Sequence, residues 1–244
     1  MRCAGRWSVR WSEVAATAVA LDRWLLPGEC LVCRGAAGAT DPLVCDRCRL
    51  AWRPVPPPWC AHCGQPLEAG IACRLCAWWP LSLDRVRSAV WLEDGARRAV
   101  HCLKYEGWWR IAAPMARAMK ELEPLAGPII LVPVPLAPKR LRERGYNQSE
   151  RLADALGHAV GRPVGSVLRR VRETPTQTAL TPEARLANVA GAFSARGVSG
   201  RAVVLVDDVF TTGATLAAAA EALATAGAAP VAAVTFARAR PVLG

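Results

Sequence analysis

The chain has 244 residues, of which 52% are hydrophobic, so it is long and apolar enough for one or two domains with packed cores. No uninterrupted apolar run reaches the roughly 20 residues that a transmembrane helix needs, and we therefore expect no membrane span. The formal net charge of +11 favours a polyanionic partner such as nucleic acid, although a basic, solvated surface would give the same total.

Aromatic and sulfur-containing residues are unevenly distributed along the chain. All ten tryptophans lie at or before Trp109, and all ten cysteines lie at or before Cys102. The C-terminal half instead carries alanine-rich runs and glycines, which are typical of α/β domains. This asymmetry predicts two units that join near residues 79–84.

Residues 1–27 are expected to form a short amphipathic helix. The apolar side chains that recur there at helical spacing are Trp11, Val14, Ala18, Leu21 and Leu25. A secretory signal is the alternative, because arginines precede the apolar run. Glu13 and Asp22 bracket that run, however, and leave it shorter and less apolar than a signal requires.

Eight cysteines in C-x-x-C pairs follow, at spacings typical of metal ligands. The pairs are Cys30/Cys33, Cys45/Cys48, Cys60/Cys63 and Cys73/Cys76. A two-residue spacer lets both thiolates bind one tetrahedral ion, and two pairs complete a closed Cys₄ site. We therefore expect two structural zinc ions, with disulfides as the alternative.

The order of the pairs bears on which cysteines share an ion. Sequential pairing closes the shorter loops and predicts a double zinc ribbon over residues 28–80, with the proline run at 54–58 as a stiff spacer. Crossed pairing, as in RING-like folds, remains open on spacing alone. Four tryptophans flank the pairs, and either stack on nucleic-acid bases or fill the seam between units: Trp52, Trp59, Trp78 and Trp79.

Residues 84–125 predict a strand followed by two helices. Apolar and polar side chains alternate over residues 85–92, which is a strand pattern. Asp94 is expected to cap a helix through Leu103, and a second helix is expected over Ile111–Leu122. Lys104 and Tyr105, at the end of the first helix, are candidates for ligand contact, although a solvated lysine and a packed tyrosine explain them equally well.

A basic segment follows the next predicted strand, Ile129–Val134. Pro133 and Pro135 lack the backbone N–H that a sheet requires, so the strand should end there. The cations that follow are Lys139, Arg140, Arg142 and Arg144. At the carboxyl end of a core strand they would bind pyrophosphate or a nucleic-acid backbone, and the alternative is a solvated basic turn. Asn147 is expected to cap a helix through Val160.

Residues 168–200 have no clean periodicity and predict a long loop. Pro175, Pro182 and several threonines interrupt any regular pattern. Loops of this length in compact domains are usually functional or disordered.

An acidic pair and a hydroxyl-rich turn follow the buried strand predicted over Val203–Val206. Asp207 and Asp208 are expected at the strand end, where ligands of open α/β sheets bind. The turn over residues 211–215 opens a helix, whose N-terminus suits a phosphate, whereas carboxylates suit a ribose diol or Mg²⁺. This stretch alone predicts a sugar-phosphate site, with a generic αβ loop capped by threonines as the alternative. The helix should run to about Ala226, and Val231–Phe236 should be a further parallel strand.

The pattern D-D-x-x-T-T-G-x-T at residues 207–215 resembles the phosphoribosyl pyrophosphate (PRPP) loop of type I phosphoribosyltransferases. Further motifs are L-K-Y at 103–105, V-P-V-P at 132–135 and R-x-R-G-Y-N-Q at 142–148. With the cysteine pairs, they resemble the ComF family of competence-associated, phosphoribosyltransferase-like proteins nearly end to end. Trp108 and Trp109 depart from the family pattern, which has smaller or polar residues there.

The resemblance implies a type I phosphoribosyltransferase-like α/β domain with a parallel sheet over residues 84–240, behind the double zinc ribbon. Asp207 and Asp208 would hold the ribose hydroxyls of PRPP, help to position Mg²⁺ and be the catalytic residues of any pentosyl transfer. The 5′-phosphate would bind to Thr211, Thr212, Gly213, Ala214 and Thr215. Pyrophosphate or a DNA backbone would bind to Arg140, Arg142 and Arg144. A mobile loop that closes over PRPP would carry Thr174, Gln177, Arg185 and Asn188.

The same resemblance implies a cytoplasmic protein that binds PRPP and handles single-stranded DNA during natural transformation, alongside a DNA-uptake helicase or channel protein. Two alternatives remain open. One is an active phosphoribosyltransferase on an unidentified acceptor, for which no base-recognition motif or general base is evident. The other is a non-catalytic PRPP sensor.

Overall fold

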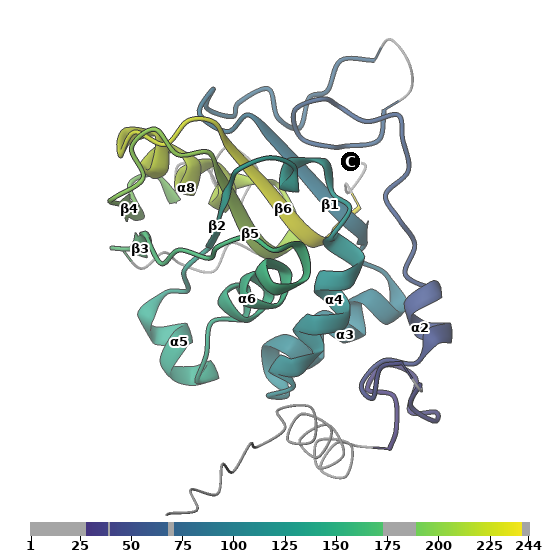
Figure 1. Ribbon diagram of the computed structural model, residues 1–244. Helices are drawn as coiled ribbons and strands as arrows, with labels where there is room; N and C mark the ends of the chain where they lie inside the picture. Colours follow the sequence, from purple (N-terminus) through teal and green to yellow (C-terminus); the bar gives the residue numbers. More distant parts are fainter. Residues whose placement is uncertain (1–27, 39, 68–70, 173–188, 241–244) are drawn as a thin grey trace, which may run out of the picture.

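A four-stranded parallel sheet forms the centre of the molecule (Figure 1). The computed structural model describes residues 28–38, 40–67, 71–172 and 189–240, so the helix expected over residues 1–27 lies outside the described residues. The strands, in spatial order, are β1 (Arg85–Trp91), β6 (Val231–Arg238), β5 (Val203–Phe210) and β2 (Ile130–Pro133). Every residue of β6 is buried, as expected for a central strand of a parallel sheet covered on both faces.

The strand β5 is longer than the sequence pattern indicated. We expected it to end at Val206, but it continues through Asp207 and Asp208 to Phe210. The reason is its pairing with β6, in which Asp207 lies opposite Thr235 and Val209 lies opposite Ala237. The acidic pair is therefore held within the sheet by backbone pairing, and does not lie in a loop beyond it.

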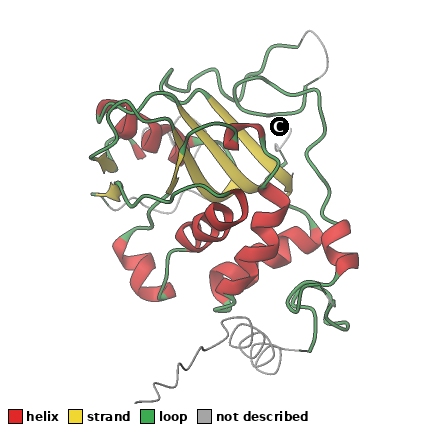
Figure 2. Ribbon diagram, viewed as in Figure 1, coloured by secondary structure: helices red, strands yellow, loops and turns green. Residues whose placement is uncertain are grey.

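Helices cover both faces of the sheet (Figure 2). On one face α3 (Asp94–Tyr105), α4 (Ala112–Met119) and α6 (Gln148–Val160) pack against alternate residues of β5 and β6. On the other face α8 (Ala214–Thr225) covers the remaining side chains of the same strands. Shorter elements are α2 (Asp46–Leu50), η1 (Trp109–Ile111), η2 (Glu123–Leu125) and α5 (Pro138–Arg144).

The helix boundaries follow local capping. Asn147 caps α6 as predicted, because its side chain accepts a hydrogen bond from the Ser149 amide at 3.1 Å. Asp94 was expected to be a cap but is the first residue of α3, after Glu93. The helix predicted over Ile111–Leu122 instead starts as the 3₁₀ turn η1 and ends at Met119.

Two short strands lie within the segment predicted as a long loop. Strand β3 (Leu168–Arg170) pairs antiparallel with β4 (Phe193–Ala195), because Leu168 and Phe193 bury their side chains beside α8. The expected mobile-loop residues all lie in 173–188, outside the described residues: Thr174, Gln177, Arg185 and Asn188.

The proline-rich spacer lies along the open edge of β1. The Val55 amide donates to the Ala89 carbonyl at 3.3 Å, and the Trp91 amide donates to the Arg53 carbonyl at 2.9 Å. At the start of the same strand, the Val86 amide donates to the His62 carbonyl at 2.7 Å. The cysteine-rich segment thus satisfies backbone groups that an edge strand would leave exposed.

Both cysteine-rich units also share hydrophobic cores with the α/β domain. Leu31, Leu43 and Trp52 pack with the helices α3 and α4, and the Trp52 ring meets Phe236 edge-on at 4.9 Å between centroids. On the other face, Cys63 and Trp79 belong to the core beneath α8. The proposed units 28–80 and 84–240 are therefore joined by two continuous cores. None of the helices in the described part of the chain has the length and apolar character that a bilayer crossing requires.

Candidate functional site

The eight paired cysteines form two clusters in the order predicted from loop length. The first ribbon holds the cluster of Cys30, Cys33, Cys45 and Cys48, and the second ribbon holds the cluster of Cys60, Cys63, Cys73 and Cys76. Within each cluster all four sulfur atoms lie within 4.8 Å of one another. The sequential arrangement is therefore confirmed, and the crossed arrangement is not found.

The sulfur geometry fits zinc. Zn–S bonds of about 2.3 Å at tetrahedral angles place neighbouring sulfurs about 3.8 Å apart. The Sγ–Sγ distance is 3.8 Å for Cys33 and Cys45 and 3.6 Å for Cys60 and Cys76, far longer than the roughly 2.05 Å of a disulfide. Because four thiols complete each site, no position remains for a substrate, and the metals they fit are structural.

His62 lies between two ligands of the second cluster but is not part of it. Its Nε2 atom contacts the Leu83 carbonyl, and its ring meets Trp79 edge-on at 5.3 Å between centroids. The histidine therefore packs the ribbon against the start of β1.

The acidic pair on β5 is held by two partners from helices. Asp208 is almost fully buried, and its carboxylate forms an ion pair with Lys104 Nζ at 2.7 Å. Asp207 accepts a hydrogen bond from Ser149 Oγ, the second residue of α6, at 2.7 Å. Burial and the neighbouring Asp208 raise the pKa of Asp207 to about 7. Burial by itself lowers the pKa of Lys104, but its pairing with Asp208 outweighs burial and raises that pKa overall.

An open cleft of about 490 Å³ lies between the end of α3 and the second half of α5 with the turn that follows it. Three cations and one acid are among its lining residues, which are Lys104, Tyr105, Gly107, Arg140, Glu143, Arg144 and Tyr146. Of the three arginines predicted to bind pyrophosphate or DNA, Arg140 and Arg144 line this cleft and Arg142 does not. Asp207 and Asp208 are also not among these residues. Lys104 links the two features, because it lines the cleft and contacts Asp208 behind it.

The turn at residues 211–213 is in contact with the second ribbon. Trp79 Nε1 donates to the Thr212 carbonyl at 3.2 Å. Gly213 has φ of +81°, and a Cβ atom at this position would come within 2.1 Å of the Trp79 ring. We expected Gly213 to allow close approach of an anion, but here its missing side chain makes room for an indole. Thr211 is exposed, while Ala214 is buried and begins α8.

Arg238 was given no role by the sequence, yet it is fully buried at the end of β6. Its Nη1 donates to the Cys63 carbonyl at 2.8 Å, and its Nη2 donates to Gln65 Oε1 at 3.1 Å. The guanidinium also lies 4.0 Å from the centroid of the Phe210 ring, at the end of β5. A single arginine ending an eight-residue apolar strand was the available signal for this role.

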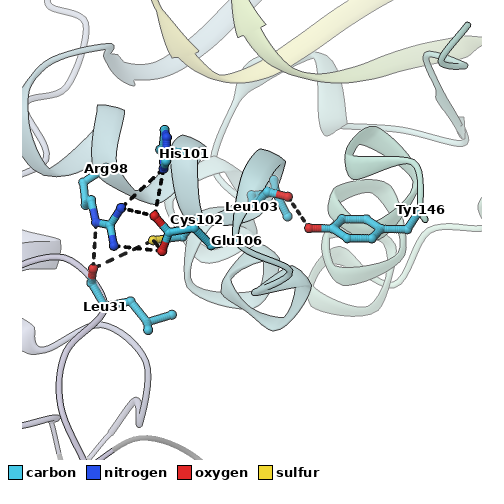
Figure 3. Close-up of polar contacts among 7 residues, drawn as sticks. All are labelled: Leu31, Arg98, His101, Cys102, Leu103, Glu106 and Tyr146. Atoms are coloured by element: carbon cyan, nitrogen blue, oxygen red, sulfur yellow. Dashed lines mark hydrogen bonds and ion pairs between the residues drawn. The ribbon is translucent and has the colours of Figure 1, made fainter. Parts of the chain in front are cut away.

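The first ribbon holds the end of α3 through a polar network (Figure 3). Arg98 donates to the Leu31 carbonyl at 3.2 Å and pairs with Glu106, which also contacts His101. On the opposite side of the helix, the Tyr146 hydroxyl donates to the Leu103 carbonyl. These contacts fix the helix turn that carries Lys104 and Tyr105.

Replacing Lys104 with methionine is expected to lower the free energy of unfolding by about 3 kcal/mol, because Asp208 would remain buried without its cation. This value is the lower end of the range for breaking buried ion pairs, because the Lys104 side chain is 20% exposed and water partly screens the pair. Urea denaturation would measure the change. The double variant Lys104→Met/Asp208→Asn should lose less stability than the single one, and an equal or greater loss would contradict this assignment.

Comparisons with known proteins find matches to both the cysteine-rich segment and the α/β domain. The double zinc ribbon domain matches residues 21–77, and the phosphoribosyl transferase domain matches residues 143–241. DNA utilization protein YhgH of Salmonella typhi is 34% identical, covering 84% of this chain and 95% of that protein. Competence protein F of Haemophilus influenzae is 30% identical, covering 77% of this chain and 86% of that protein. Competence protein ComFC of Bacillus subtilis is 29% identical over 72% of this chain and 75% of its own length.

Proposed function

Since this chain belongs to the ComF family, whose members join a double zinc ribbon to a phosphoribosyltransferase domain, we propose that it is a PRPP-binding protein of competence and DNA utilization that handles single-stranded DNA. The names of its relatives support the biological role, and the transferase domain supports the ligand. The observation that carries the ligand proposal is the cationic cleft whose Lys104 contacts Asp208 of the acidic pair on β5.

Three groups of residues match the parts of PRPP in chemical type. The pyrophosphate carries several negative charges, and Lys104, Arg140 and Arg144 supply cations at the cleft wall. Carboxylates hold ribose hydroxyls well, so Asp207 and Asp208 take that role in the proposal. The 5′-phosphate is assigned to Thr211–Thr215, where the N-terminus of α8 offers backbone N–H groups.

The acidic pair also fits Mg²⁺ in donor type, because hard carboxylate oxygens are the ligands that this ion prefers. Bound Mg²⁺ would neutralise part of the pyrophosphate charge. Asp208 now has Lys104 as its partner, so the proposal requires Lys104 to exchange that carboxylate for a phosphate oxygen when the ligand binds. Arg140 and Arg144 then hold the ligand, and Ser149 keeps Asp207 oriented by its hydrogen bond.

Calorimetry with Mg²⁺–PRPP tests the ligand proposal. The wild-type chain is expected to bind, and Asp207→Asn/Asp208→Asn is expected to bind at least tenfold more weakly, because the ribose and metal contacts are lost. The matched control is Glu150→Ala/Asp154→Ala, which removes two exposed carboxylates from α6 and should bind like the wild type.

Circular dichroism would establish that the variants are folded. The proposal fails if the wild type releases no heat under conditions that saturate a known phosphoribosyltransferase. It also fails if the two double variants bind Mg²⁺–PRPP equally well.

A further inference from the structure

Two exposed aromatic rings lie at the end of α3 and the start of η1, each with an arginine stacked over it. Tyr105 is 68% exposed, and the Arg144 guanidinium lies 5.3 Å from its ring centroid. Trp109 is 42% exposed, with Arg151 at 4.9 Å and Arg110 at 5.3 Å from its ring. Tyr105 and Trp109 are four residues apart in the sequence, so their Cα atoms are at most about 14 Å apart.

Each ring borders a cavity with cationic walls. Tyr105 borders the cleft that Lys104, Arg140 and Arg144 line. Trp109 borders a second cavity of about 390 Å³ between the first ribbon, the start of α4 and α6. That cavity carries Arg110, Arg117 and Arg151, and one of its two acids, Asp41, is already paired with Arg117. The same short aromatic segment therefore borders both cavities, and in each cavity the cationic side chains outnumber the acidic ones.

This combination matches the chemistry of a single nucleic-acid strand. Unpaired bases stack on flat side chains whatever their sequence, while arginines contact the phosphates between them. An acidic peptide would use the arginines but has no need of two exposed rings. A duplex would contact the arginines but keeps its bases stacked within the helix and away from the rings.

We infer that the strip formed by Tyr105, Trp109, Arg144 and Arg151 is a track for single-stranded nucleic acid, on which successive bases stack. This inference rests on the proposed function and assigns a surface to its DNA-handling part. It also gives a role to Trp109, which departs from the family pattern at this position. The track lies on the α/β domain, whereas the exposed tryptophans Trp59 and Trp78 belong to the cysteine-rich segment.

Fluorescence anisotropy with a labelled oligo-dT strand tests the inference at a stated salt concentration. Tyr105→Ala and Trp109→Ala are each expected to weaken binding about tenfold, and the double variant about 100-fold. The same variants should bind an abasic strand of equal length as the wild type does, because only the stacking is removed. Trp78→Ala is the matched control, since this tryptophan is 68% exposed on the second ribbon.

The salt dependence distinguishes stacking from charge. Arg144→Gln and Arg151→Gln should each lower the slope of log K against log salt by about 0.7, the value for one phosphate contact on a single strand. Arg201→Gln, an exposed arginine just before β5, should leave the slope unchanged.

The outcomes separate the inference from the function on which it rests. If the wild type binds oligo-dT and the ring variants bind equally well, the track is wrong while the proposed function stands. If the wild type binds no single strand, both the track and the DNA-handling proposal fail, whatever calorimetry shows for PRPP. Displacement of oligo-dT by polyglutamate at equal affinity would overturn the track in favour of an acidic protein partner.

Discussion

Removal of metal from the second cysteine cluster is expected to unfold the whole chain, including the α/β domain. Structural zinc contributes about 10–16 kcal/mol of binding free energy, which is comparable to the entire stability of a typical domain. Cys63 is fully buried and belongs to the core beneath α8, so the loss extends into the sheet. Cys63→Ser or a strong chelator should therefore abolish the cooperative melting transition seen by circular dichroism.

Cys102→Ala provides the control for this experiment, because Cys102 is a buried cysteine outside both clusters. It should retain two zinc ions per chain by a metallochromic assay and keep a cooperative transition. An α/β domain that melts unchanged after both ions are removed would show that the ribbons do not support it.

Gly213→Ala is expected to lower the free energy of unfolding by about 3 kcal/mol or more. The backbone at Gly213 has φ of +81°, which alone is unfavourable by about 1–2 kcal/mol for alanine. The new Cβ atom would also lie 2.1 Å from the buried Trp79 ring, which cannot move without leaving its core. Chemical denaturation would measure the loss.

A double-mutant cycle with Trp79→Ala separates the backbone strain at position 213 from the steric clash between the new Cβ atom and the Trp79 ring. Removing the indole creates a cavity but also gives the Cβ atom room, so the two substitutions should be less destabilising together than the sum of the single effects. Strict additivity would mean that Trp79 and Gly213 do not restrict each other.

The main elements of the fold were predictable because their signals are local. The C-x-x-C spacing, the apolar strands and the Asn147 cap each lie within a few residues, and the structure has each of them. The end of β5 was placed wrongly because Asp207 and Asp208 read as loop residues. Their place in the strand depends on pairing with β6, which is distant in the sequence.

The candidate site was predictable in part for the same reason. The acidic pair and the basic segment are short motifs, and Arg140 and Arg144 do line the cleft. Three features depend on contacts across more than 100 residues: Lys104 with Asp208, Trp79 with Gly213, and Arg238 with Cys63. Neither periodicity nor composition predicts that Arg238 would contact the second ribbon.

The pairing of Arg53–Val55 with β1 has a consequence for dissecting this protein. A fragment that began at Asp84 would carry all four strands of the sheet but lack the segment whose backbone pairs with the outer edge of β1, the edge that faces away from β6. Such an edge is a template for strands from other molecules, so the fragment would be prone to self-association and precipitation. The cysteine-rich segment therefore protects the α/β domain against aggregation by covering the outer edge of β1.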